Sequence, residues 1–196
     1  MSNFRIFSES KADIKFLKDY IEEILHVQLS DNDFDPLGSW SDYKAGGSLK
    51  ASIKQNHYDD QKTTILILDA DNDFEARREE ILEDFGEFEV PVSLFLFPNN
   101  NSAGNIESLL ATIGVDQKLM TCFLEYETCV RGYNKPLNHS RIYAYLDLLL
   151  DPNHLDENNK DLRREEYRNY RNAAHWNLNH AYLTPLREFL QPFFTP

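Results

Sequence analysis

The sequence is poor in several kinds of residue, and each scarcity excludes a class of protein. Cysteine occurs only twice in 196 residues, at Cys122 and Cys129, so no disulfide framework is expected. The longest apolar runs, 65–68 and 94–97, are four residues each, which is far too short to span a bilayer. The six histidines show no metal-ligand spacing. We therefore expect a soluble cytoplasmic protein with no membrane partner.

Positive charge is also scarce. The chain has 20 Lys and Arg against 33 Asp and Glu, which gives a formal net charge of −13. This balance argues against a protein that coats DNA by bulk charge, although it leaves room for a local basic face or a metal-bridged phosphate site. Hydrophobic residues make up 41% and charged residues 27% of the chain. This composition is typical of a globular protein that can bury a full core.

Short apolar runs alternate with amphipathic segments over the first 115 residues. Strands are expected at 4–7, 39–43, 63–68 and 92–97, and helices at 10–25, 48–56, 75–85 and 106–113. The run 63–68 is β-branched or apolar throughout, which suits a strand buried on both faces. The alternation predicts an α/β domain at 1–115, with a Rossmann-like parallel sheet of about four strands and helices on both faces.

The strand pattern disappears after Gly114. Helices are expected at 117–130, 141–150, 159–174 and 183–193, with a polar loop at 151–159. Residues 116–196 are thus predicted to form a helical extension that packs on the α/β domain, so that both regions make one structural unit.

Carboxylates stand where two of the expected strands end. Ligands of open parallel sheets bind beyond the carboxyl ends of the strands. Asp69 and Asp71 follow the strand 63–68 and are two residues apart, so both can face one side, roughly 7 Å from each other. Glu9 follows the first strand and joins them if the two strands are neighbours. Such carboxylates repel one another unless a cation lies between them, and oxygen ligands favour Mg²⁺ or Mn²⁺. A site of this kind performs phosphoryl chemistry.

Six further residues are candidates of lower rank. Asp73 and Glu107 either add to the metal ligands or act as acids at helix N-termini. Lys11 either contacts a phosphate or is solvated. The remaining candidate phosphate or substrate contacts are Gly46 and Gly47, which could also serve a tight turn, and Asn99, which follows the fourth strand.

These motifs in combination resemble the Toprim domain of topoisomerases, bacterial primases, RNase M5-like nucleases and the overcoming-lysogenisation-defect nucleases. The resemblance is carried by Glu9-Ser10-Lys11-Ala12-Asp13, by Gly46-Gly47 and by Leu68-Asp69-Ala70-Asp71. Ser10 stands where most Toprim domains have glycine. The resemblance extends to an uncharacterised Toprim-like family through Pro98-Asn99, Gly104-Asn105-Ile106-Glu107, residues 142–146, Trp176-x-Leu178 and residues 183–186.

The resemblance implies two functions. In the first, the chain is a Mg²⁺-dependent nuclease or phosphoryl-transfer enzyme that acts on nucleic acid, with Glu9, Asp69 and Asp71 as metal ligands and catalytic residues. In the second, it is a non-catalytic module that partners an ATPase, with a role in phage defence. Both leave a homo-oligomer open.

Other interpretations of the acidic motif fit the sequence less well. An EF-hand loop starting at Asp69 would need glycine at Phe74 and a preceding helix. Haloacid-dehalogenase phosphatases place their Asp-x-Asp after the first strand. A phosphate receiver using Asp69 would need a lysine at the end of the last strand. The basic and aromatic stretch 163–171 could hold a nucleic-acid backbone or form a solvated helix face.

Overall fold

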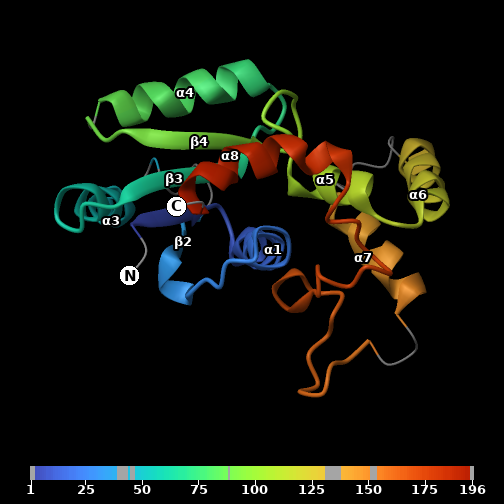
Figure 1. The fold of residues 1–196 in the computed structure, drawn as a ribbon. Helices are drawn as coiled ribbons and strands as arrows, with labels where there is room; N and C mark the ends of the chain where they lie inside the picture. The colour runs from blue at the N-terminus through green and yellow to red at the C-terminus, as the bar shows by residue number, and fades with distance from the viewer. Residues whose placement is uncertain are drawn as a thin grey trace.

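The central sheet has four strands in the described part of the chain, and all of them are parallel (Figure 1). The structure is a computed structural model that describes residues 3–38, 44, 47–87, 89–130, 138–150 and 154–194, without the side chains of 47–49 and 138–140. The strand order is β2-β1-β3-β4. The strands are β1 (Phe4–Ser8), β2 (Phe34–Pro36), β3 (Thr63–Asp69) and β4 (Val92–Phe97).

Helices connect the strands and continue beyond them. Those of the first half are α1 (Lys11–Tyr20), extended by the π-helical turn Ile21–Leu25, α3 (Gly47–Tyr58), α4 (Phe74–Gly86) and α5 (Ile106–Ile113). The second half contributes α6 (Gln117–Val130), α7 (Asn138–Leu149) and α8 (Thr184–Phe194). Short 3-10 turns occur at Asp31–Asp33 (η2), Glu165–Tyr167 (η3) and Ala181–Leu183 (η4). No helix in the described residues is both long and apolar enough to cross a membrane.

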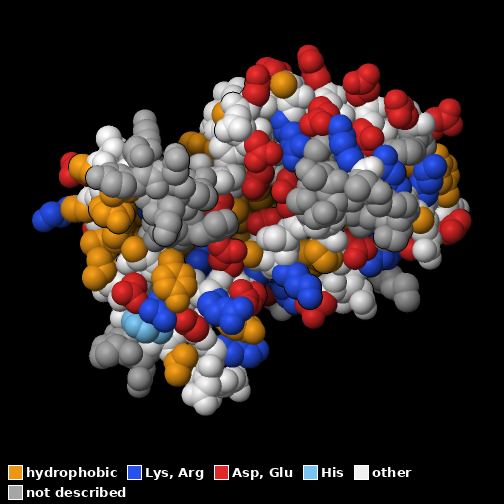
Figure 2. Space-filling view, turned by 180° about the vertical axis from the view of Figure 1, so that it is seen from behind, with side chains coloured by type: hydrophobic (Ala, Val, Ile, Leu, Met, Phe, Trp, Pro, Cys, Tyr) orange, Lys and Arg blue, Asp and Glu red, His pale blue; other side chains and the backbone are white. Residues whose placement is uncertain are grey.

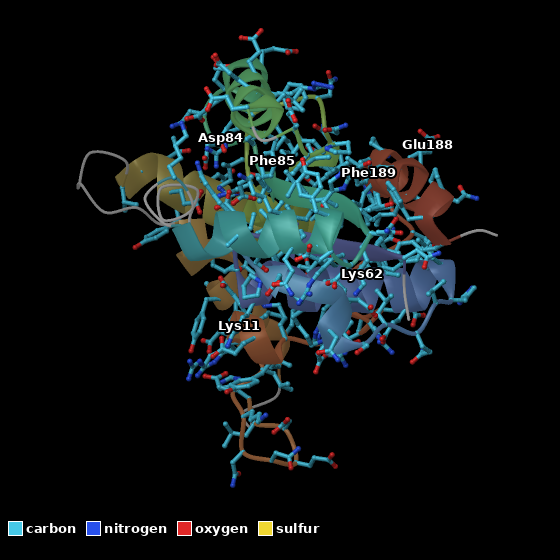
Figure 3. The ribbon with its side chains drawn as sticks, turned by 90° about the vertical axis from the view of Figure 1, so that its left-hand side faces the viewer. Lys11, Lys62, Asp84, Phe85, Glu188 and Phe189 are labelled. Carbon is cyan, nitrogen blue, oxygen red and sulfur yellow. The ribbon has the colours of Figure 1, made fainter. Side chains whose placement is uncertain are left out.

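Helices cover both faces of the sheet, as the sequence predicts. Alternate residues of β3 point to opposite sides. Ile65 and Ile67 belong to a core with α1, α5, α7 and α8, whereas Leu66 and Leu68 belong to a second core with α3 and α4. Phe85 of α4 belongs to the second core, and Phe189 of α8 packs against the first (both labelled in Figure 3). The Rossmann-like α/β class is therefore confirmed. The boundary predicted at residue 115 stays a prediction, although residues on both sides of it share the first core.

The second strand lies earlier than the sequence pattern indicates. The expected strand at 39–43 falls outside the described residues. A three-residue strand at Phe34–Pro36 pairs in parallel with β1, with Ile6 opposite Phe34. The pattern does not reveal this strand because it ends in Asp35 and Pro36, which are typical of a strand edge rather than of a strand centre.

The helix expected at 159–174 is wrong. This region is irregular apart from η3. Its Asp and Asn side chains accept hydrogen bonds from backbone N–H groups two residues further on, which offers the backbone an alternative to helix. The pairs are Asp161 with Arg163 (3.0 Å), Asn169 with Arg171 (3.1 Å) and Asn172 with Ala174 (3.0 Å).

One buried carboxylate on α1 fastens this irregular segment to the fold. Asp19 accepts a hydrogen bond from the backbone N–H of Tyr170 (3.1 Å), and it also pairs with Lys15 and Arg171. The Tyr170 ring is fully buried and packs edge-on against Phe16, with 5.3 Å between ring centroids. The polar anchor and the aromatic contact together order a segment that has little regular structure.

Asp19→Ala is expected to lower the free energy of unfolding by about 2–3 kcal/mol, because the buried N–H of Tyr170 and Lys15 lose their acceptor and Arg171 keeps only its pair with Glu22. Urea unfolding measures the change. Asp31→Ala is the matched control, since Asp31 also pairs with a lysine, Lys18, but its side chain is 94% exposed. We expect a much smaller change there. Equal losses in the two variants would contradict the anchoring role of Asp19.

Candidate functional site

The strand order creates a crevice at one place on the carboxyl edge of the sheet. From β1 the chain crosses to β2 on one side, and it returns through α3 to β3 on the other side of β1. The segments that follow β1 and β3 therefore leave the sheet in opposite directions. In open parallel sheets this topological switch point is where ligands bind. Glu9 follows β1, and Asp69 ends β3, so both stand at the switch point.

Glu9 and Asp69 meet directly there. The carboxylate of Glu9 accepts a hydrogen bond from the backbone N–H of Asp69, with 3.4 Å from nitrogen to Oε1. The Oδ1 atom of Asp69 accepts in turn from the N–H of Ile106, at 3.1 Å, in the first turn of α5. A helix N-terminus favours a negative charge. The chain thus holds Asp69 between the end of β1 and the start of α5.

A backbone bridge places Asp71 beside the loop that precedes α5. Asp71 has φ 56°, and its N–H and C=O exchange hydrogen bonds with Gly104, at 2.9 and 2.7 Å. Gly104 has φ 135°, and a Cβ there would lie 3.1 Å from the Pro98 ring and 3.2 Å from the Ser108 hydroxyl. Only glycine fits this conformation and this space. The bridge therefore fixes where the Asp71 side chain, which is 60% exposed, can reach.

A cation of the protein itself connects the acidic residues. Arg77 of α4 is mostly buried, with 10% of its side chain exposed. Its Nη2 lies 3.1 Å from Glu9 Oε1 and 3.6 Å from Asp71 Oδ2. Its Nε donates to the backbone carbonyl of Asp69 at 3.3 Å, and its Nη1 lies 3.3 Å from Glu80. One guanidinium thus contacts all three acidic positions predicted from the sequence, through two side chains and one carbonyl.

Asp13 adds a further carboxylate whose charge acts on Asp69. It is buried and closes a capping box on α1, where Asp13 Oδ2 accepts from Ser10 N at 2.8 Å and Ser10 Oγ accepts from Asp13 N at 3.1 Å. Burial, with a smaller contribution from the charges of Glu107 and Glu165, raises the pKa of Asp13 to about 6. Glu165 belongs to η3, so the irregular C-terminal segment also contributes charge to the site.

The carboxylates at the crevice hold their protons more tightly than usual. Burial, together with the nearby charges of Asp13, Glu9 and Glu107, raises the pKa of Asp69 to about 9. Burial also raises the pKa of Glu9, while Arg77 opposes that shift. Of these carboxyl groups, Asp69 is therefore the one that is hardest to deprotonate in the folded protein.

The other predicted residues lie in different places. Asp73 is the N-cap of α4, where its Oδ1 accepts from the N–H of Ala76 at 3.1 Å. Glu107 lies in the first turn of α5 and reaches the crevice. Asn99 belongs to the turn after β4, and its Oδ1 accepts from the N–H of Asn101 and the hydroxyl of Ser102. Lys11 is exposed at the start of α1, Gly47 begins α3, and Gly46 lies outside the described residues.

A polar pocket of about 200 Å³ opens beside these carboxylates. Its walls come from the loop after β3, from the start of α5 and from α7. The lining residues are Asp71, Asn72, Gly104, Asn105, Glu107, Ser108 and Arg141. The pocket joins two of the predicted acids with residues that the sequence reasoning missed.

The site contains two arginines, Arg77 and Arg141, and the sequence indicates a place near the site only for the first. Arg77 lies four residues after the helix-capping Asp73, and this spacing puts it one turn into α4 on the side above the strand end. The sequence alone therefore carries a signal for the position of Arg77. Arg141 had none, because the sequence does not say against which element α7 packs. Within the described residues, no group of three or more His, Cys, Asp or Glu side chains is arranged so that it could hold a metal ion.

In the absence of divalent ions, we expect the free energy of unfolding to fall as the pH rises from about 4 to about 9. The unfolded chain releases the Asp69 proton near pH 4, whereas the folded chain keeps it to about pH 9. The folded state therefore binds more protons in this window, so stability decreases with pH. Asp69→Asn should melt at least about 5 °C above the wild type at pH 8 and within about 2 °C at pH 4.5.

The Asp69→Asn variant also allows the titration of Asp13 to be followed separately from that of Asp69. Asp13, with its pKa raised to about 6, should leave a fall in stability between about pH 4 and pH 6 in Asp69→Asn. Calorimetric melts across this range measure both windows. A melting difference between wild type and Asp69→Asn that is the same at pH 4.5 and pH 8 would contradict the raised pKa of Asp69.

Comparison with known proteins adds no further likeness. No family model matches the chain, and neither a curated protein nor a solved structure matches it. The resemblance to Toprim domains therefore rests on Glu9, Asp69, Asp71 and the other motif residues named above.

Proposed function

We propose that this chain is a Toprim-type phosphoryl-transfer protein, a nuclease that uses Mg²⁺ or Mn²⁺ to act on nucleic acid. The observation that supports this most is the convergence of Glu9, Asp69 and Asp71 at the β1/β3 switch point, where one guanidinium already spans two of the carboxylates. The motif residues of distant sequence segments thus meet where ligands of parallel sheets bind.

The chemistry of the donor set fits a hard divalent ion. All the candidate ligands are carboxylate oxygens, the type that Mg²⁺ prefers. Burial raises the pKa values of Glu9 and Asp69, and the charges of neighbouring carboxylates raise them further, so an additional positive charge would stabilise both as anions. Mg²⁺ is usually held by only one or two carboxylates, with waters and substrate phosphates completing its shell. A dedicated cage of three protein ligands is not needed for such a site.

The residues of the chain would then have distinct roles. Glu9, Asp69 and Asp71 would hold the ion, and the ion would supply Lewis acidity and lower the pKa of a nucleophilic water. Asp73 and Glu107 are outer candidates for the same shell, and Glu107 already reaches the pocket. Arg77 keeps Glu9 and Asp71 turned toward each other. The candidate phosphate contacts are Lys11, Gly46, Gly47 and Asn99.

Arg77 also favours the second function that the resemblance implies. A guanidinium that neutralises Glu9 and Asp71 does part of what an ion would do, and such an internal cation suits a non-catalytic module that partners an ATPase. The acidic surface fits a module as well, because Figure 2 shows acidic side chains gathered along α4 at the upper edge of this face. The two functions differ in whether metal binds and whether phosphodiesters are cut.

Millimolar Mg²⁺ or Mn²⁺ should raise the melting temperature of the wild type by several degrees, because an ion that binds only the folded site stabilises it. The rise should be larger at pH 8 than at pH 6, since binding displaces protons from the carboxylates. Asp69→Asn/Asp71→Asn should abolish it. Asp59→Asn/Asp60→Asn is the matched control, because this exposed pair precedes β3 at the opposite edge of the sheet. Equal shifts in both double variants would argue against a metal site at the switch point.

A nucleic-acid cleavage assay distinguishes the proposed nuclease from the non-catalytic module. With Mn²⁺ or Mg²⁺, the wild type should cut or nick some single- or double-stranded DNA or RNA, and Glu9→Gln should reduce the rate at least about a hundredfold with an unchanged melting temperature. The net charge of −13 repels the substrate, so we expect slow cleavage by the chain alone and faster cleavage with an ATPase partner. A broad substrate panel that shows no metal-dependent cleavage, with or without that partner, would favour the module.

A further inference from the structure

Arg141 brings a positive charge from the helical half of the chain to the acidic pocket. Arg141 lines the pocket together with Asp71 and Glu107. Arg141 also forms a two-point ion pair with Glu127 of α6, in which Nε donates to Oε1 at 2.9 Å and Nη2 contacts Oε2. Such a paired arrangement fixes the plane of the guanidinium. The ion pair therefore holds Arg141 in one orientation at the pocket wall.

The pair leaves part of the guanidinium without a protein acceptor. Nε and Nη2 are used by Glu127, and Nη1 has no hydrogen-bond partner among the described residues. If this ion pair served only to join α6 and α7, Arg141 would not need to lie beside a pocket. Here Arg141 is one of the residues that line the pocket, and its side chain is 24% exposed. The two N–H groups on Nη1 are thus available to an anionic ligand.

Asn105 offers a second donor to the same pocket. Its Oδ1 accepts from both the N–H and the hydroxyl of Ser108, at 3.1 and 2.8 Å. Because the oxygen is committed to capping α5, the amide nitrogen of Asn105 is the end left for other partners, and it has none among the described residues. Two fixed donor groups and two carboxylates therefore surround one small cavity.

The combination of N–H donors and carboxylates at this pocket favours one chemical class of ligand. A free anion would be repelled by Asp71 and Glu107, and a bare cation would be repelled by Arg141. A phosphate group attached to a divalent ion satisfies both sets, because the ion meets the carboxylates and the phosphate oxygens meet the donors. A volume of about 200 Å³ is below the range of whole small-molecule sites, so it suits a phosphate with its ester neighbours rather than a base.

We infer that Arg141 and Asn105 form a phosphate-binding subsite that orients a phosphate ester against an ion held at Asp71, the proposed metal ligand that lines the same pocket. This inference rests on the proposed metal site and extends it to residues of the helical extension. It makes α7 part of substrate binding, with Glu127 as the residue that positions Arg141. The helical half would thus take part in binding as well as in packing on the sheet.

The test is calorimetric titration of the Mg²⁺-loaded protein with three probes: inorganic phosphate, thymidine 5′-monophosphate and an oligothymidylate without terminal phosphates. Arg141→Gln should weaken phosphate binding at least about tenfold, the loss expected for one charge-assisted hydrogen bond. Glu127→Gln/Arg141→Gln should give the same loss without leaving an unpaired carboxylate between α6 and α7. Asn105→Ser keeps a capping oxygen and should weaken binding about threefold to tenfold.

Arg78→Gln is the matched control, because Arg78 is exposed on α4 and does not line the pocket. It should bind every probe as the wild type does. Tighter binding of the monophosphate than of the oligonucleotide supports a terminal phosphate as ligand, and the reverse order supports an internal phosphodiester. Mg²⁺ binding with equal phosphate affinities in Arg141→Gln and Arg78→Gln overturns this inference alone. A wild type that binds no Mg²⁺ overturns the proposed function and the inference together.

Discussion

The burial of several carboxylates close together at one edge of the sheet is the constraint around which this structure is organised. Glu9, Asp13 and Asp69 converge there, and burial makes their charges costly. The fold offsets this cost with groups from three directions: the Arg77 guanidinium from α4, the N–H of Ile106 from α5 and the N–H of Ser10 at the N-cap of α1. A cluster that is only partly compensated in this way retains affinity for a further cation, which connects the electrostatics of the fold to the proposed metal site.

The same edge is completed by parts of the chain that are far apart in sequence. The Asp71–Gly104 bridge ties the loop after β3 to the start of α5, and it works only because Gly104 adopts a conformation that side chains disfavour. The C-terminal half adds Arg141 to the pocket and Glu165 to the charges around Asp13. A boundary drawn through the middle of the chain would therefore divide the candidate site as well as the core.

Much of the fold follows from local pattern. The strands β1, β3 and β4 and the helices α5 and α6 lie where apolar periodicity predicts them, because burial on a sheet face or a helix stripe imposes a period on the sequence. The pattern failed where local side-chain hydrogen bonds compete with helix, as in 159–174, and where a three-residue strand is too short to show a period, as in β2. In both places, contacts with α1 or β1 decide the conformation.

The sequence by itself determined the α/β class and the identity of the acidic residues at the strand ends, since strand burial and the oxygen chemistry of carboxylates are local properties. It also determined the helix caps, because Asp73 and Asp13 act on backbone groups within three residues. Only the tertiary structure decided that β1 and β3 are neighbours, that Arg77 lies between Glu9 and Asp71, and that Arg141 reaches the pocket. The physical reason is that charge interactions depend on distance in space, and strand order and helix packing set those distances.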